Sequence, residues 1–193
     1  MFAGSNIKLF EDGQRLFLTT DERHKFRETI HTLSTQQRLF CRLLYYTGCK
    51  INEAVAFLPE HINEQKSSIL LGYKGKMLSE RYVPIPPAFS IELAIYLKPR
   101  NGFMQDPQLS FSRTKGWRLI KDVMNKSGIH GKQATPTGLR HSFAISCLEV
   151  TPPIPIERIQ KWMGHKSSDL TVSYLEAFQQ DEDKSLELLW KHF

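Results

Sequence analysis

The chain has 193 residues, 40% hydrophobic and 24% charged, with a net charge of +6, which is typical of one globular domain and compatible with a polyanionic partner. It has no apolar run near the roughly 20 residues that a membrane-spanning helix needs and no secretory signal, so we expect a cytoplasmic protein without a membrane partner. Three cysteines without a C-x-x-C pair argue against a disulfide framework and against a zinc site.

The first part of the chain has clear helix signals. Thr19 and Glu22 have the spacing of a capping box, with a hydroxyl at the N-cap and a carboxylate three residues later, so a helix should follow. Residues 1–17 then form only a short N-terminal arm. A second, apolar helix is predicted from about Thr35 to Tyr46, and Gly48 should end it.

The next segment changes from helical to strand-like composition. A short helix is predicted from Ile51 to Leu58. Two β-rich runs, 68–73 and 81–85, flank a turn that contains Lys74 and Lys76, and this arrangement predicts a β-hairpin. Clustered prolines should stop the second strand, because proline cannot donate a ladder hydrogen bond.

The rest of the chain is predicted to be helical from Phe89 onward. Breaks are expected near 99–106 and near 128–136, where glycine and proline collect, and a new helix should start near Gly138. After a break at 151–155, further helices are predicted over 156–163 and 167–178. The predicted fold class is therefore mainly α with a small antiparallel β-sheet.

The C-terminal residues carry a separate apolar pattern. Leu186, Leu189, Trp190 and Phe193 follow the i, i+3, i+4, i+7 spacing of one helix face. We expect residues 179–193 to form a helical tail. The tail could pack on its own domain or dock on a neighbouring protomer, and the sequence leaves both open.

Four segments far apart in the sequence carry the residues suited to chemistry. They are TGCKINEA at 47–54, a hairpin lysine at 74 or 76, TPTGLRHSFA at 135–144, and WMGHK at 162–166 followed by Tyr174. In order and spacing they resemble the boxes of the tyrosine recombinase (phage integrase) family, in which a tyrosine follows the histidine of a G-H box by nine residues. The resemblance covers about 18–178 and implies that family's catalytic-domain fold.

The family's reaction, as the resemblance implies, is DNA strand exchange through a 3′-phosphotyrosine. Cleavage of a phosphodiester needs cations that stabilise charge on the phosphate oxygens and an acid that protonates the leaving 5′ oxygen. A tyrosine nucleophile keeps the bond energy in a covalent intermediate. We therefore expect double-stranded DNA as the partner and no metal or organic cofactor.

The resemblance assigns roles to individual residues. Tyr174 resembles the nucleophile, and Arg140 resembles the second arginine of the phosphate clamp. His165 resembles the histidine that hydrogen-bonds the scissile phosphate. The hairpin lysine that protonates the leaving oxygen aligns with Lys76 better than with Lys74.

Three further residues receive supporting roles. Glu53 resembles the acid that supports the first clamp position, and His141 is expected to pack structurally beside Arg140. Lys166 is expected to contact DNA together with the hairpin lysines and Arg140. The resemblance also implies a homo-oligomer on DNA, because strand exchange between two duplexes needs several protomers.

Two positions depart from the family pattern. The first clamp arginine is Lys50, which keeps the charge but loses the bidentate guanidinium fork. The expected general base, three residues before Arg140, is Thr137, whose hydroxyl cannot hold a proton near neutral pH. We expect a recombinase with residual activity; the alternative is an impaired, recombinase-like DNA-binding protein that regulates or assists recombination.

Many relatives carry an additional N-terminal domain that grips the other face of the DNA. Fewer than twenty residues precede the first predicted helix here, so we expect weaker and strongly salt-dependent DNA binding. An unrelated helical interaction protein would require every box to arise by coincidence. The sequence does not specify the DNA site or the outcome of recombination.

Overall fold

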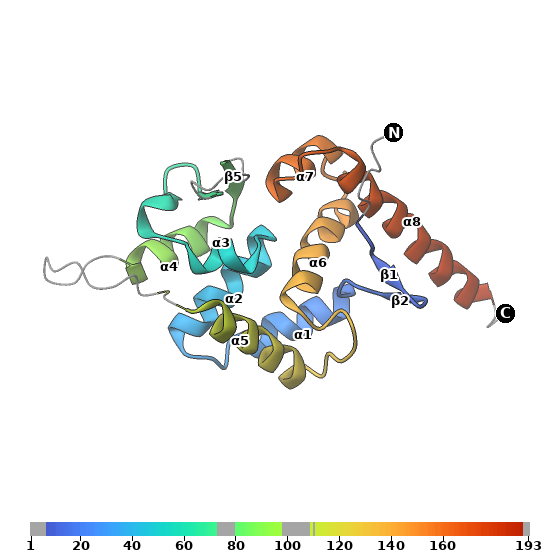
Figure 1. The fold of residues 1–193 in the computed structure, drawn as a ribbon, viewed down its shortest axis with the longest axis horizontal. Coiled ribbons are helices and arrows are strands. Elements are labelled where there is room, and N and C mark those ends of the chain that lie inside the picture. Colours follow the sequence, from blue (N-terminus) through green and yellow to red (C-terminus); the bar gives the residue numbers. More distant parts are fainter. Residues whose placement is uncertain (1–6, 73–79, 98–108, 110, 191–193) are drawn as a thin grey trace, which may run out of the picture.

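The computed structural model describes residues 7–72, 80–97, 109 and 111–190, with side chains left out for 183–189. Helices make up most of the described chain, and a small antiparallel sheet lies at one end of the molecule (Figure 1). In chain order the elements are β1 (Phe10–Glu11), β2 (Gln14–Arg15), α1 (Thr20–Ile30), α2 (Thr35–Thr47), α3 (Ile51–Val55), the 3-10 turn η1 (Pro59–His61), β3 (Ile62–Asn63), β4 (Ser68–Leu71), β5 (Arg81–Pro84), α4 (Pro87–Leu97), α5 (Arg113–Lys126), α6 (Pro136–Glu149), α7 (Ile156–Met163) and α8 (Asp169–Trp190).

Local capping signals place several helix ends, as the sequence predicts. Thr19 and Glu22 form the expected capping box at the start of α1. Gly48 caps the end of α2 in the left-handed conformation, with φ of 57°. An added Cβ at Gly48 would lie 2.5 Å from the Phe143 ring, so both backbone angle and space require glycine. The predicted bounds of α7 are also confirmed.

The helices α3 and α6 have bounds that differ from the predictions. The helix α3 ends at Val55 rather than Leu58, because Leu58 precedes Pro59 and adopts extended backbone angles. The helix α6 starts at Pro136, two residues before the predicted start. Proline suits the first helical position, and Thr135 is the N-cap, whose side chain accepts a hydrogen bond from the Gly138 amide at 3.0 Å.

The predicted fold class, mainly α with a small antiparallel β-sheet, is confirmed, and the predicted hairpin strands are present. Strands β4 and β5 pair antiparallel, with Ile69 opposite Val83 and Leu71 opposite Arg81. A third strand, β3, pairs with β4, and β1 and β2 form a separate two-stranded sheet. Strands of two residues are too short to show an alternating pattern in the sequence. The turn with Lys74 and Lys76 lies outside the described residues.

Buried side chains form two clusters that meet at α6. The larger cluster includes residues of α1, α2, α4, α5 and the three-stranded sheet. In the smaller cluster Leu9 and Phe17 pack with Ile145, Ile159 and Tyr174. Residues of the predicted arm thus contribute to the core around α8, and α6 lies between the two groups of helices (Figure 1).

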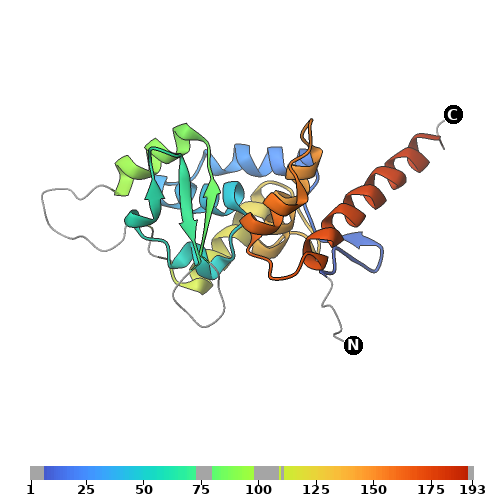
Figure 2. The ribbon, with the colours of Figure 1, turned by 90° about the horizontal axis from the view of Figure 1, so that it is seen from above.

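The last helix is longer than predicted. The helix α8 runs without a break to Trp190, so no change of secondary structure marks the predicted start of the tail at 179. Figure 2 shows its C-terminal half projecting away from the rest of the molecule, and Trp190 is 65% exposed. The side chains of Leu186 and Leu189, and all of Phe193, lie outside the described residues. None of the described helices is long and apolar enough to cross a membrane.

Candidate active site

Ile7 and residues from four further segments line one cleft of about 700 Å³. The start of α3, the first turns of α6, the loop between α7 and α8, and α8 itself contribute to it. Its lining includes seven of the residues that the sequence analysis selected, namely Lys50, Thr137, Arg140, His141, His165, Lys166 and Tyr174. The fold therefore gathers positions that are up to 124 residues apart in the sequence.

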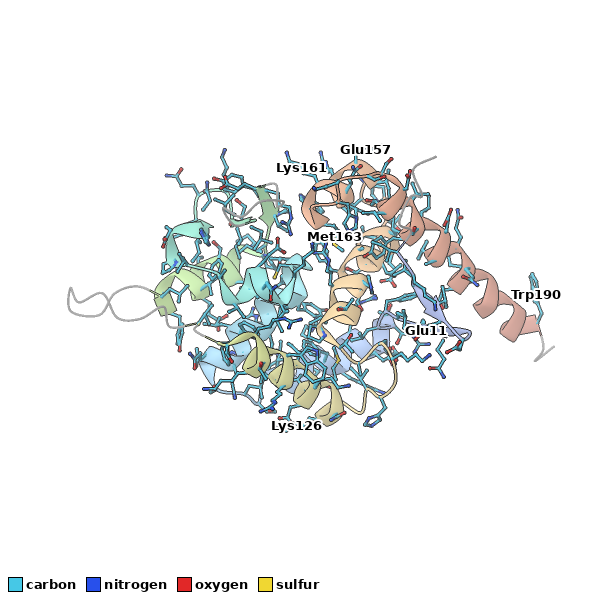
Figure 3. The ribbon with its side chains drawn as sticks, in the orientation of Figure 1. Glu11, Lys126, Glu157, Lys161, Met163 and Trp190 are labelled. Carbon is cyan, nitrogen blue, oxygen red and sulfur yellow. The ribbon has the colours of Figure 1, made fainter. Side chains whose placement is uncertain are left out.

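Arg140 contacts residues from three other parts of the chain around the cleft. Its side chain is buried, and its two terminal nitrogens donate to the Gly48 carbonyl and to the Met163 carbonyl, each at 2.6 Å. Met163 is the last residue of α7 and lies where that helix meets α6 (Figure 3). One Arg140 nitrogen also lies 3.4 Å from Nε2 of His165. A guanidinium has five N–H donors, so these contacts leave donor capacity for a ligand in the cleft.

His165 follows the left-handed Gly164, which ends α7 and turns the chain into the cleft. Because Arg140 can only donate, Nε2 of His165 is the acceptor and Nδ1 donates to the Thr171 hydroxyl at 3.0 Å. Burial, together with the positive charges of Arg140, Lys50 and Arg81, lowers the pKa of His165 to about 4. The imidazole is therefore neutral at neutral pH.

Tyr174 is held inside the wall of the cleft. Its side chain is 0% exposed, and its ring stacks on the His165 ring with centroids 5.9 Å apart. Its hydroxyl oxygen lies 2.7 Å from Nδ1 of His141. Burial raises the pKa of Tyr174, and the charge of Arg140 opposes this shift only in part. The hydroxyl thus keeps its proton in this state.

Glu53 contacts both Lys50, at the first clamp position, and Arg81. Its carboxylate accepts a hydrogen bond from the backbone N–H of Lys50 at 2.7 Å. It also forms a buried bidentate pair with Arg81 of β5, at 2.6 and 3.0 Å. Burial acts to raise the pKa of Glu53, but the hydrogen bonds and charge of Arg81 outweigh it, so the pKa is lowered.

Arg81 is the site residue that the sequence reasoning missed. Besides pairing with Glu53, it donates through Nε to the Trp162 carbonyl at 2.6 Å. An added Cβ at Gly164 would lie 3.0 Å from its guanidinium carbon. Arg81 therefore connects the hairpin, α3 and the end of α7. The available signal was strand alternation, because Arg81 has the same inward phase as Val83 and a buried arginine needs an acid.

The remaining predicted residues have more exposed positions. Thr137 lies in the first turn of α6 and is exposed at the cleft. Lys50, at the N-cap of α3, and Lys166, in the loop after His165, are also exposed. The side chains at the cleft therefore combine a buried guanidinium with exposed ammonium groups, a donor set that suits a phosphate.

Comparisons with known proteins show the family to which the chain belongs. The phage integrase family matches over residues 16–181. Tyrosine recombinase XerA of Pyrococcus furiosus is 35% identical over 167 residues, which cover 81% of this chain and 56% of that protein. The chain thus spans little more than half the length of this relative.

Solved structures show the same fold. A crystal structure of XerA recombinase is 26% identical, with a TM-score of 0.69 over 83% of this chain and 60% of that chain. XerH site-specific recombinase, bound to palindromic difH substrate, has a TM-score of 0.70 at 22% identity, over 97% of this chain and 57% of that chain. The expected tyrosine recombinase catalytic-domain fold is confirmed, and the chain belongs to the phage integrase family.

Proposed function

We propose that this chain is the catalytic part of a site-specific DNA recombinase that cleaves and rejoins DNA through a 3′-phosphotyrosine at Tyr174. The observation that carries the proposal is the single cleft in which Tyr174, Arg140, His165 and Lys50 meet. A phenol, a guanidinium, an imidazole and an ammonium at one site supply a nucleophile and cations for a phosphodiester. On this proposal the catalytic domain spans residues 18–178.

The phosphate would be bound by Arg140, His165 and Lys50. The two carbonyl contacts of Arg140 fix the guanidinium before DNA arrives, so little reorganisation is needed when charge develops on phosphorus-bound oxygens. His165 is neutral and can donate a hydrogen bond to phosphate after a change of tautomer. Lys50 adds charge without bidentate geometry, so we expect slower cleavage than an arginine would give.

The bond changes are those of nucleophilic displacement at phosphorus. The Tyr174 oxygen forms a bond to phosphorus, and the bond to the 5′ oxygen breaks, so that the 5′ oxygen leaves with a proton from an acid. The sequence assigns this acid to the hairpin lysine, Lys76 or Lys74. Because Tyr174 is fully buried, the cleft must open before a phosphate can reach its hydroxyl.

The proposed partner is double-stranded DNA. XerH, which shares the fold, is bound to its difH DNA substrate in its crystal structure, and the net charge of +6 favours a polyanion. We further propose a homo-oligomer on DNA, a cytoplasmic location where such DNA is found, and no requirement for a metal or organic cofactor.

A second function is a recombinase-like protein that binds DNA without cutting it. Lys50 and Thr137 favour this alternative, because they replace two groups that the family uses in chemistry. The closed environment of Tyr174 is also compatible with it.

Covalent capture separates the two functions. A duplex that binds the protein is first selected from a random pool at low salt, and nicked versions of it are incubated with the protein. We expect a DNA-linked species on a denaturing gel, absent for Tyr174→Phe although this variant still binds the duplex. Tight binding by the unaltered chain without any linked species would favour the non-cutting function.

A further inference from the structure

His141 has a contact that a merely structural residue would not need. It follows Arg140 on α6 and is 8% exposed, and its Nδ1 lies 2.7 Å from the Tyr174 hydroxyl, which is the proposed nucleophile. The two ring centroids are 5.6 Å apart and the planes are inclined by 51°, so the rings do not stack. The hydrogen bond is therefore the main polar link between them.

The protonation states of the two side chains allow Tyr174 to donate this hydrogen bond to His141. Burial, with the charges of Arg140 and His165, lowers the pKa of His141 to about 4, so its imidazole is neutral. Burial raises the pKa of Tyr174, so its hydroxyl carries a proton. A neutral imidazole has one acceptor nitrogen, and in the tautomer protonated at Nε2 that acceptor is Nδ1, which then receives the hydrogen bond of the Tyr174 hydroxyl. This is the geometry of a general base and its substrate hydroxyl.

His141 lies on the same face of α6 as Thr137, the residue at the position where the family has its general base. Thr137 and His141 are four residues apart, and such residues lie one above the other on the same helix face. Both line the cleft. The imidazole of His141 can thus accept a proton in the same cleft, where Thr137 contributes only a hydroxyl.

We propose that His141 is a catalytic residue, the general base that accepts the proton of Tyr174 during cleavage. As the Tyr174 oxygen bonds to phosphorus, its proton moves to Nδ1 of His141, and the electron pair of the broken bond goes to the 5′ oxygen. During rejoining, the 5′ hydroxyl attacks phosphorus and gives its proton back to the group that acted as the acid, while the imidazolium returns the other proton to the leaving tyrosine oxygen. The inference rests on the proposed function.

The charged and titratable groups around His141 favour proton transfer to it once DNA is bound. Arg140 comes from its own helix, His165 from the loop after α7, and Tyr174 from α8. Without DNA, Arg140 disfavours a second positive charge on the neighbouring imidazole. A phosphate bound by Arg140 brings negative charge into the cleft, which favours the protonated form of His141. DNA binding would therefore make His141 a better proton acceptor at the moment when it is needed.

The competing role is a lock that only keeps Tyr174 buried. The two roles predict different effects of a His141 substitution on the rate at which the tyrosine–DNA bond forms. Removal of a base slows formation of the tyrosine–DNA bond, whereas removal of a lock leaves it unchanged or makes it faster.

The experiment measures single-turnover cleavage of a selected duplex whose scissile phosphate carries sulfur in place of the bridging 5′ oxygen. A thiolate leaves without protonation, so the acid step no longer contributes to the rate. We compare the unaltered chain with His141→Gln and His141→Ala, and use His130→Gln as the matched control, because His130 is exposed and lies outside the cleft lining.

We expect both His141 variants to lose about 10²-fold or more in cleavage rate, with duplex binding and the control unchanged. Added imidazoles should restore cleavage by His141→Ala, with a rate that rises with the basicity of the imidazole. His141→Gln keeps an acceptor for the tyrosine hydroxyl, so its loss of rate would separate proton transfer from packing.

If His141→Gln cleaves DNA at or above the rate of the unaltered chain, His141 is not the general base. Its role would then be only to keep Tyr174 buried. A rescue that is indifferent to imidazole basicity would overturn the role of general base as well. If the unaltered chain binds the duplex but forms no adduct, the proposed function itself fails, which is a different result from an active chain that tolerates loss of His141.

Discussion

Arg81 and Glu53 form the most enclosed ion pair among the described residues, with side-chain exposures of 3% and 2%. A buried pair contributes little compared with an apolar replacement of both members, but loss of one member leaves the other charge without a partner. In this fold the pair also holds the Lys50 backbone and the Trp162 carbonyl, so its loss should affect the whole cleft.

We predict that Arg81→Met lowers the free energy of unfolding by about 3–5 kcal/mol, measured by urea denaturation at neutral pH. Arg113→Met, at an exposed position of α5, is the control and should change it by less than about 0.5 kcal/mol. Equal effects of the two substitutions would show that the buried pair does not hold the site together.

The ionisable side chains of His141, His165 and Glu53 predict how the stability of the fold depends on pH. The pKa of His141 and that of His165 are lowered to about 4 in the fold, so between pH 6.5 and 4 the unfolded chain takes up protons that the folded chain does not. The lowered pKa of Glu53 adds stability above its unfolded pKa, which is lost as the pH falls through the folded value. Stability should therefore decrease steadily below pH 6.5.

Urea midpoints measured at pH 7.5, 6 and 5 test this dependence. His141 alone contributes on the order of 3 kcal/mol across the window, from a shift of its pKa from 6.5 to about 4. His141→Gln should flatten the pH dependence by part of this amount. A midpoint that stays constant or rises toward acid pH would contradict the neutral, buried state of the two histidines.

At the scale of single elements, the structure follows the sequence where the signal is local. Thr19 with Glu22, Gly48 and Thr135 with Pro136 act on their own helix ends, so a short stretch of sequence is sufficient to recognise them. The seven cleft residues that the sequence analysis selected could also be chosen from short segments, because each lies in or near a family motif.

The long-range pairs could not be predicted. Glu53 and Arg81 are 28 residues apart, and His141 and Tyr174 are 33 apart, so their contacts depend on how whole elements pack. His141 was expected to pack structurally, and its contact with the Tyr174 hydroxyl was not predicted, because Tyr174 lies on another helix. The two-residue strands β1 and β3 were missed because their pairing, rather than their own composition, makes them strands.

Two glycines allow a matched test of packing at helix ends. Gly48 and Gly128 both have positive φ, of 57° and 68°, but only Gly48 has a neighbouring side chain where a Cβ would lie. Both alanine variants should lose about 1–2 kcal/mol from the left-handed backbone. We predict a larger loss for Gly48→Ala, because the Phe143 ring must move. Equal unfolding free energies would contradict the close approach of α2 and α6.

At the scale of the whole molecule, the projecting half of α8 suggests a role in assembly. Leu186, Leu189 and Trp190 of the predicted apolar stripe fall within this half of α8, and Trp190 is exposed. We predict that truncation after Phe178 leaves the affinity of one protomer for DNA largely intact and reduces cooperativity between protomers in a DNA titration. Unchanged cooperativity would indicate that residues 179–193 serve only their own chain.

The charge of the molecule predicts a strong salt dependence of DNA binding. Each phosphate that the protein neutralises releases counterions, so log Kobs should fall linearly with log salt concentration. Lys166→Ala should reduce the slope by about 1 if this exposed lysine contacts one phosphate. Lys126→Ala, at the C-terminal end of α5 and away from Met163 in Figure 3, should leave the slope unchanged, because Lys126 does not line the cleft. A slope near zero for the unaltered chain would exclude phosphate contacts as the source of affinity.

The central claim is that Tyr174 attacks DNA, and the most direct test is to find the attached nucleotide. The covalent adduct formed on a nicked, selected duplex is digested with nuclease and protease, and the peptides are analysed by mass spectrometry. We predict a 3′-phosphonucleotide on the peptide that contains Tyr174. Attachment to any other residue, or an unmodified Tyr174 peptide under conditions in which the duplex is fully bound, would contradict the account.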